Sequence, residues 1–122
     1  LHTSETEDIS SALLATGFPY DMPASEEDNL KHFAHFSKAA LGIRRAGSAA
    51  LDLAYVAAGR LDGFWELKLK MWDMAAGSVI VEMAGGQTTT FTGKKWSITS
   101  DRIVASNGKI HRAMLKIIRG NQ

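Results

Sequence analysis

The sequence predicts an α/β fold in which helices are layered against a sheet. Short apolar runs that end near Gly or Pro alternate with segments of helical periodicity. The length of 122 residues and the hydrophobic content of 45% suit one ordinary domain, or part of one, with a modest core. No internal repeat or low-complexity tract interrupts the alternation, which disfavours a helical bundle and a β-sandwich.

The first third of the chain predicts a strand followed by a helix. The run SALLATGFPYD at 11–21 is apolar until Gly17 and Pro19, as expected for a buried strand that ends in a loop. Ser25 is the expected N-cap of the helix, because acidic residues at 26–28 complement the helix dipole. The expected packed stripe of this helix is Leu30, Phe33, Phe36 and Ala40.

The remaining chain continues the alternation. A short strand is expected at 43–46, a helix at 48–58 closed by Gly59, and a strand through Phe64 and Trp65. A helix at 74–84 ends at the glycines 85–86, and strands are expected within 87–93 and 102–108. The final helix has an apolar face made of Ile110, Ala113, Met114, Ile117 and Ile118.

The helices expected at 48–58 and 74–84 are apolar on nearly every face, whereas a helix on a domain surface keeps a polar side. We therefore expect both to be buried on more than one side, with part of their cover coming from another polypeptide or a missing half. A first residue that is Leu1 rather than Met agrees with a piece of a longer protein.

Charge and cysteine content exclude several classes of function. Fourteen basic and thirteen acidic residues leave a net charge of +1, which argues against a nucleic-acid or anionic-membrane partner. The absence of cysteine excludes disulfides, thiolate zinc sites and thiol nucleophiles, and agrees with a reducing cytosol. No apolar stretch approaches the roughly 20 residues of a membrane span. We expect a soluble, cytoplasmic protein.

Two acidic residues are candidates for chemistry, and each has two interpretations. Asp73 is either an N-cap of its helix or a carboxylate ligand for a hard cation such as Mg²⁺. Glu66 is either an exposed charge at a strand end or an acceptor for substrate hydroxyls, since strand ends and helix starts converge where α/β folds bind ligands. Spacing alone favours the cap for Asp73 and the exposed charge for Glu66.

The segment AGSAA at 46–50 places Gly47 and a capping Ser48 at the start of a helix, followed by Ala49. It is either ordinary capping or a set of backbone N–H groups presented to a ligand past small side chains. His32 and His35 are three residues apart on a helix, but without a third ligand nearby they favour a solvated pair over a metal site.

Three segments together resemble the C-terminal half of the inositol monophosphatase family. They are GIRRAGSAALDLAYVAAGRLDGFWE at 42–66, WDMAAGSVIVEMAGG at 72–86 and IVASNGKIHRAML at 103–115. Three features follow one another in the family's order: the Gly-Ser-Ala-Ala element, the acidic strand end and the Trp-Asp-x-Ala-Ala signature. This combination is far more specific than any one motif. The resemblance extends from residue 13 to nearly the end of the chain.

The resemblance implies a layered αβαβα sugar-phosphatase fold, of which residues 1–122 form the C-terminal part while the N-terminal half is absent. It implies a Mg²⁺-dependent phosphomonoesterase for inositol monophosphate or a similar polyol phosphate, usually a homodimer. Asp73 would then ligate the metal, which would be this chain's only catalytic contribution. Glu66 and Ala49, with Gly47 and Ser48 beside it, would contact the substrate.

Two departures from the family pattern stand out. Glu82 is followed by Met83 before the alanine and the two glycines, which shifts the acidic residue by one position. The family's Asp-Pro-(Ile/Leu)-Asp-Gly-Thr element and its upstream metal-binding Glu are absent, so we expect the isolated chain to be inactive. Alternatives are a fructose-bisphosphate or nucleotide phosphatase of the same family and a non-catalytic interaction module.

Overall fold

A computed structural model describes residues 1–18, 29–69 and 71–120. The strands are β1 (Leu13–Thr16), β2 (Gly42–Arg44), β3 (Gly63–Glu66), β4 (Gln87–Thr89) and β5 (Ile103–Ser106). The helices are the 3₁₀ turn η1 (Ile9–Ser11), α1 (Leu30–Ala39), α2 (Ala49–Ala57), α3 (Met71–Met83) and α4 (His111–Ile118). None of the helices within the described ranges has the length and apolar content that a membrane span requires.

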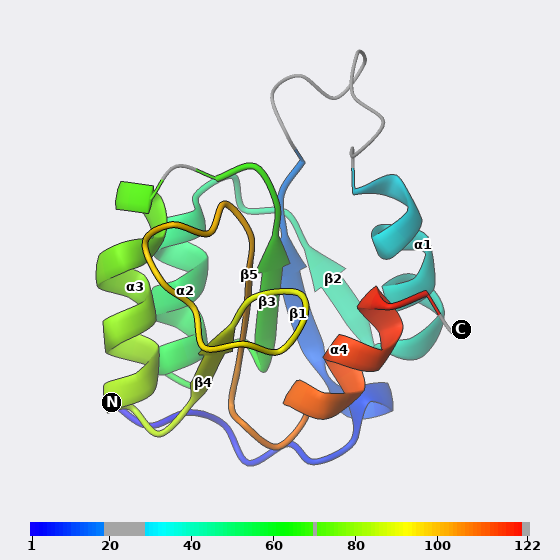
Figure 1. The fold of residues 1–122 in the computed structure, drawn as a ribbon. Helices are drawn as coiled ribbons and strands as arrows, with labels where there is room; N and C mark the ends of the chain where they lie inside the picture. The colour runs from blue at the N-terminus through cyan, green and yellow to red at the C-terminus, as the bar shows by residue number, and fades with distance from the viewer. Residues whose placement is uncertain (19–28, 70, 121–122) are drawn as a thin grey trace.

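The strands form one mixed sheet in the order β2-β1-β3-β5-β4. β1 pairs in parallel with both β2 and β3, whereas β5 pairs antiparallel with β3 and β4. Helices α2 and α3 cover one face and α1 and α4 cover the other (Figure 1). The predicted α/β layering is therefore confirmed.

Each face of the sheet has its own core cluster. Successive residues of a strand point to opposite faces, so Leu14 packs with α1 and α4 while Ala15 packs with α2 and α3. In the same way, Trp65 belongs to the cluster with α1 and α4, and Phe64 belongs to the cluster with α2 and α3. Because both faces are covered, the strands are apolar throughout rather than alternating.

Three parallel strands place their carboxyl ends at one edge of the sheet, the upper edge in Figure 1. From there β1 leads towards α1 on one face, whereas its neighbours β2 and β3 lead to α2 and α3 on the other. Chain segments that leave adjacent strands in opposite directions open a crevice between them, which is where open α/β sheets bind ligands. This rule favours a site outside the carboxyl ends of β1 and β3, a position that we call the crevice between β1 and β3.

Most predicted elements are confirmed. Ser48 caps α2 by accepting a hydrogen bond from the Leu51 N–H at 3.2 Å, and Gly59 follows α2 with a positive φ of 78°. The last helix buries Met114 and Ile118 as expected. Ser25, the expected cap of α1, lies outside the described residues.

Two predictions are wrong. Leu30 was expected in the packed stripe of α1 but is 52% exposed, because the first turn of that helix extends beyond the core that buries Phe36. The helix predicted at 74–84 begins at Met71, so Asp73 lies inside its first turn and is not the N-cap.

Helices α2 and α3 pack closely, and the outer side of α3 is open. A side chain at Gly77 would have its Cβ 2.5 Å from Leu53 Cδ1, so glycine permits this approach of the two helices. The apolar side chains of the outer side remain exposed: 56% for Val79, 38% for Ile80 and 83% for Met83. In this chain α3 is thus buried on one side only.

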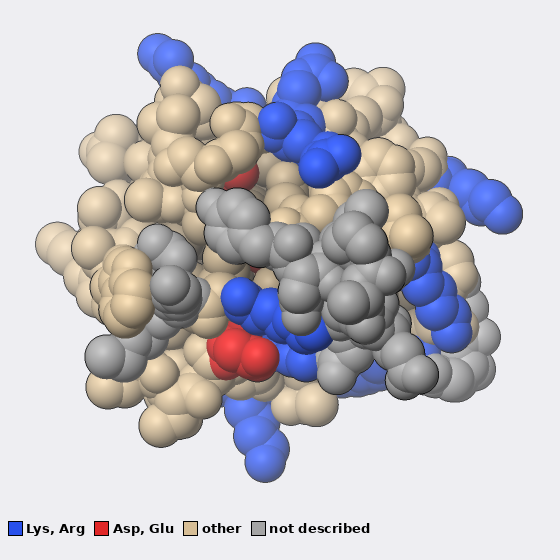
Figure 2. Space-filling model, turned by 90° about the horizontal axis from the view of Figure 1, so that it is seen from above, with Lys and Arg blue, Asp and Glu red and all other residues tan. Residues whose placement is uncertain are grey.

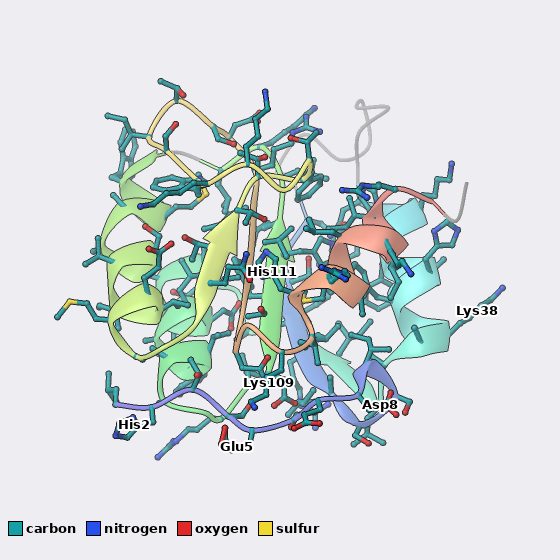
Figure 3. The ribbon with its side chains drawn as sticks, turned by 60° about the horizontal axis from the view of Figure 1, so that its bottom comes forward. His2, Glu5, Asp8, Lys38, Lys109 and His111 are labelled. Atoms are coloured by element: carbon teal, nitrogen blue, oxygen red, sulfur yellow. The ribbon has the colours of Figure 1, made fainter. Side chains whose placement is uncertain are left out.

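The lower edge of the sheet is closed by the segment that precedes β1. The buried Asp62 carboxylate accepts hydrogen bonds from the Leu13 N–H at 2.7 Å and from Ser4 Oγ at 2.5 Å. Asn107 Nδ2 donates to Ser4 Oγ at 3.0 Å and to the Thr6 carbonyl at 2.7 Å. Lys109 lies beside Glu5 at this edge (Figure 3).

Candidate functional site

Glu66 and Gly17 lie side by side at the crevice between β1 and β3. Thr16 pairs in register with Trp65, so the next residues along the two strands are Gly17 and Glu66. A Cβ on Gly17 would lie 2.6 Å from Glu66 Oε1, so the missing side chain leaves room for the carboxylate. Glu66 is half-buried at this position, so its carboxylate lies beside Gly17 at the carboxyl ends of β1 and β3.

Asn29 joins the ends of the two strands beneath this carboxylate. It is 2% exposed, and its Nδ2 donates to Thr16 Oγ1 at 2.9 Å and to the Gly17 carbonyl at 2.8 Å. Its Oδ1 accepts a hydrogen bond from Trp65 Nε1 at 2.7 Å. Sequence reasoning missed Gly17 and Asn29 as members of the site, because no local motif reveals a contact between residues so far apart in the chain.

The start of α2 is open to solvent. Gly47 has a φ of 85°, and a Cβ there would meet nothing within 4 Å, so the backbone conformation and not space requires glycine. Gly47 and Ser48 are exposed and Ala49 is half-buried. Ser48 accepts a hydrogen bond from the Leu51 N–H in this first turn, so the capping interpretation is confirmed and contact with a ligand stays a prediction.

Asp73 lies in the first turn of α3, and its side chain is outside the described part of the structure. A carboxylate in the first turn is favoured by the helix dipole. The structure brings the first turns of α2 and α3 to the same edge of the sheet as the end of β3 (Figure 1). The elements that hold Gly47, Ser48, Ala49, Glu66 and Asp73 therefore converge.

Figure 2 looks onto this edge and shows acidic side chains next to lysine and arginine side chains. The Arg45 guanidinium, just after β2, lies 4.2 Å from the centre of the Phe18 ring. Among the residues that the structure describes, no three His, Asp or Glu side chains are grouped closely enough to hold a metal ion. His32 contacts the edge of the Phe91 ring, with 5.5 Å between ring centres, and is half-buried rather than fully solvated.

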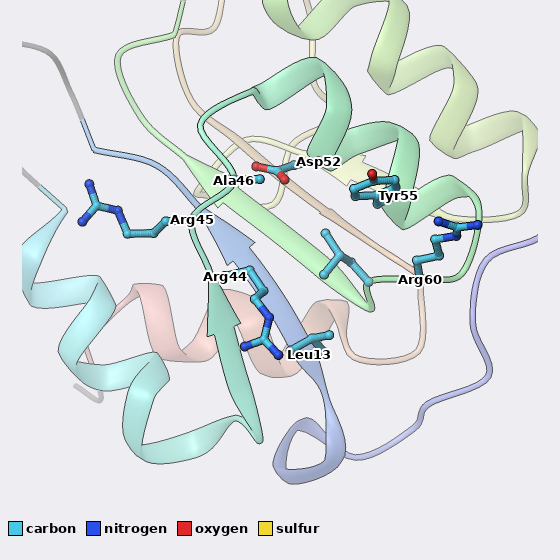
Figure 4. A pocket seen from close by; sticks show the side chains of 8 residues that line it. Leu13, Arg44, Arg45, Ala46, Asp52, Tyr55 and Arg60 are labelled. Atoms are coloured by element: carbon cyan, nitrogen blue, oxygen red, sulfur yellow. The ribbon is translucent and has the colours of Figure 1, made fainter.

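A cavity of about 410 Å³ lies between α2 and the strands β1 and β2 (Figure 4). Its lining residues are Leu13, Arg44, Arg45, Ala46, Asp52, Tyr55, Arg60 and Leu61. Asp52 is 2% exposed, its Oδ1 has no hydrogen-bond partner among the described residues, and burial raises its pKa to about 6. Three arginines, Arg44, Arg45 and Arg60, also line the cavity and make its surroundings positively charged. Among the described residues, none of them forms an ion pair with the Asp52 carboxylate.

His111 is a further buried titratable group, and it serves the fold. Its Nε2 lies 2.8 Å from Thr89 Oγ1 and its Nδ1 lies 2.8 Å from Ser106 Oγ, so the ring joins β4, β5 and α4. Burial lowers its pKa to about 4, which keeps the imidazole neutral near pH 7. Figure 3 shows it inside the molecule.

These features place the chain among α/β domains with a site at the carboxyl edge of a sheet. The model of the inositol monophosphatase family matches residues 1–122, so the chain belongs to that family. The expected membership is confirmed.

Individual relatives agree with the family match. The chain is 43% identical over 114 residues to an inositol-1-monophosphatase from Synechocystis sp., an alignment that covers 93% of this chain and 40% of the relative. It is 45% identical over 123 residues to the Nus factor SuhB of Pseudomonas aeruginosa, covering 98% of this chain and 45% of that protein.

The fold is also that of solved family members. The inositol monophosphatase from Anabaena (Nostoc) sp. superposes with a TM-score of 0.94 at 41% identity, covering 98% of this chain and 47% of that chain. These structures have the layered αβαβα fold, and this chain corresponds to about half of it. The chain thus spans less than half the length of each of these three relatives.

Proposed function

We propose that residues 1–122 form the C-terminal half of a Mg²⁺-dependent phosphomonoesterase that hydrolyses inositol monophosphate or a similar polyol phosphate. The observation that supports this most is the half-buried Glu66 carboxylate beside Gly17, at the crevice where the first turns of α2 and α3 converge in a member of a phosphatase family. An N-terminal half would complete the site. The completed enzyme would be a cytoplasmic homodimer.

Each site residue has a role in this proposal. The Glu66 carboxylate accepts hydrogen bonds from substrate hydroxyls, and the small residues Gly47, Ser48 and Ala49 let the substrate approach the start of α2. Asp73 would be one of the residues that hold the metal, which when bound would supply polarisation of the phosphoryl group and of a water molecule.

The donor set of this chain fits Mg²⁺ only in part. Mg²⁺ is a hard cation that takes one or two carboxylates together with water and phosphate oxygens. The described residues contain no cluster of three acidic or His side chains, and we propose that the N-terminal half supplies the remaining ligands. We therefore propose that the isolated chain releases no phosphate from phosphomonoesters.

The test measures phosphate release from inositol 1-phosphate and from an aryl phosphate, for the chain alone and for the enzyme completed by its N-terminal half. We expect turnover only in the completed enzyme, and loss of turnover with a chelator. In that enzyme Glu66→Gln should lower kcat/KM for the polyol substrate by about three- to tenfold relative to the aryl phosphate, the scale of one hydrogen bond. Robust turnover by the verified isolated chain, or equal losses on both substrates, would contradict these roles.

A second candidate function is binding to a protein partner. The relative from P. aeruginosa is named a Nus factor, and the outer side of α3 exposes Val79, Ile80 and Met83. A fructose-bisphosphate or nucleotide phosphatase remains the alternative within the family. Substrate profiling of the completed enzyme separates these possibilities, because a pure binding module would turn over none of the phosphate esters.

A further inference from the structure

We infer that Asn29 is a positioning residue that fixes the Glu66 carboxylate at the crevice between β1 and β3. The inference deepens the proposed function, because it rests on Glu66 as the acceptor for substrate hydroxyls. Asn29 lies outside the three segments that carry the family resemblance. The geometry of the buried hydrogen bonds points to this role.

The Asn29 side chain makes three hydrogen bonds to the ends of two strands. Its two Nδ2 hydrogens go to Thr16 Oγ1 and the Gly17 carbonyl, and its Oδ1 accepts from Trp65 Nε1. Thr16 Oγ1 in turn donates to the Trp65 carbonyl at 2.6 Å. Together these hydrogen bonds form a closed circuit that joins Thr16 of β1 to Asn29, Asn29 to Trp65 of β3, and Trp65 back to Thr16.

This circuit lies where β1 and β3 stop pairing with each other, while Glu66 still pairs with Ile103 of β5 on its other side. The described pairing of β1 with β3 ends at Thr16 and Trp65, and the next residues are Gly17 and Glu66. Asn29 binds the Gly17 carbonyl and the Trp65 side chain, so it holds the residues on both sides of the carboxylate. Trp65 is fixed further by stacking on Phe36 of α1, with ring centres 4.0 Å apart.

The backbone at position 29 favours Asn over other residues with similar side chains. Asn29 has a φ of 73°, in the left-handed region that Asn tolerates better than most residues. Glycine would adopt this conformation but has no amide, and an apolar side chain would leave the buried Trp65 N–H unpaired. Because Asn29 directly precedes α1, the position of that helix is coupled to the Glu66 carboxylate.

The first test uses Asn29→Gly, which retains the backbone conformation and removes the amide. The matched control is Asn107→Ala: Asn107 is also buried and bridges distant segments, but at the opposite edge of the sheet. We expect the ¹³C carboxyl resonance of Glu66 to shift in Asn29→Gly and to stay in place in the control. Trp65→Phe, which keeps the stacked ring and removes the N–H, should shift the same resonance.

The second test uses kinetics of the completed enzyme. Asn29→Gly should lower kcat/KM for the polyol phosphate by about three- to tenfold relative to the aryl phosphate, the scale of one hydrogen bond. The double variant Asn29→Gly/Glu66→Gln should lose no more of this preference than Glu66→Gln alone, because Asn29 acts through Glu66.

The outcomes separate this inference from the proposed function. An unmoved Glu66 resonance in both Asn29→Gly and Trp65→Phe overturns the inference, as does a fully additive loss in the double variant. If the resonance shifts but neither Glu66→Gln nor Asn29→Gly changes substrate preference, positioning by Asn29 stands and the substrate contact of Glu66 is wrong.

Discussion

Because Gly17 has no side chain, the Glu66 carboxylate can lie beside it. A Cβ would come within 2.6 Å of Glu66 Oε1, the far end of a flexible side chain. The collision can therefore be relieved by rotation of Glu66 without movement of the backbone. A side chain at position 17 can therefore displace the Glu66 carboxylate in the site without disturbing the fold.

We predict that Gly17→Ala changes the free energy of unfolding by about 1 kcal/mol or less, the cost of a displaced side-chain rotamer. In the completed enzyme it should lower the preference for polyol over aryl phosphate by about three- to tenfold. Gly42→Ala, where the nearest atom is Leu13 Cδ1 at 3.3 Å, is the control outside the crevice. Unchanged substrate preference with a large loss of stability would contradict this reading of Gly17.

Asp52 predicts a pH dependence of stability. Its folded pKa of about 6 exceeds the ordinary 3.8, so the folded state binds the proton more tightly than the unfolded state. Its contribution to stability is therefore greatest below pH 3.8 and is lost as the pH rises through about 6. His111 acts in the opposite direction: with a folded pKa of about 4 against 6.5, it costs stability as the pH falls from 6.5 to 4.

We predict that Asp52→Asn raises the melting temperature of the chain at pH 7.5 and has little effect near pH 3.5. The contribution of His111 is common to both proteins and cancels in the difference. Thermal unfolding followed by circular dichroism across this pH range is the measurement. A difference that is the same at both pH values would show that ionisation of Asp52 is not responsible.

At the scale of elements, the strands were predictable and the site was predictable only in part. The buried strands β1, β3 and β5 are continuous apolar runs, because both faces of the sheet are covered. The start of α3 was misplaced because Asp is favoured both as an N-cap and inside the first turn, so Asp73 fits either boundary. Glu66 could be found as a strand end, but Gly17 and Asn29 depend on pairings between distant segments.

The position of Asp73 inside α3 sharpens the test of its role. In the completed enzyme, Asp73→Asn should cost about 0.3–1 kcal/mol of stability through the lost interaction with the helix dipole. If Asp73 ligates the metal, Mg²⁺ affinity should weaken and turnover should fall on the order of 10²-fold, corresponding to about 3 kcal/mol. Turnover as a function of Mg²⁺ concentration, with melting measured in parallel, is the check. Unaltered Mg²⁺ dependence would refute the metal assignment.

At the scale of the molecule, the outer side of α3 is an apolar surface without cover in this chain. Under the proposed function the N-terminal half covers it. Val79→Ser should then leave the melting of the isolated chain nearly unchanged, since Val79 is 56% exposed there. It should destabilise the completed enzyme by about 1.5–3 kcal/mol, the value of burying such a side chain.

The control for this prediction is Leu41→Ser, because Leu41 is 73% exposed and precedes the edge strand β2, away from α3. It should affect neither protein. Equal melting of the completed enzyme with and without Val79→Ser would mean that the outer side of α3 is not covered by the N-terminal half.

The central place of β1 in the parallel part of the sheet also determines when the chain can fold. β1 leaves the ribosome before the strands that flank it, and its apolar residues Leu14 and Ala15 have no partner until β2 and then β3 emerge. The cluster that buries Leu14 further requires β5 and α4, which are made last. While residues 17–118 are being made, β1 is therefore a β-prone apolar segment that still lacks these partners, and such exposed segments are what chaperones bind in unfolded chains.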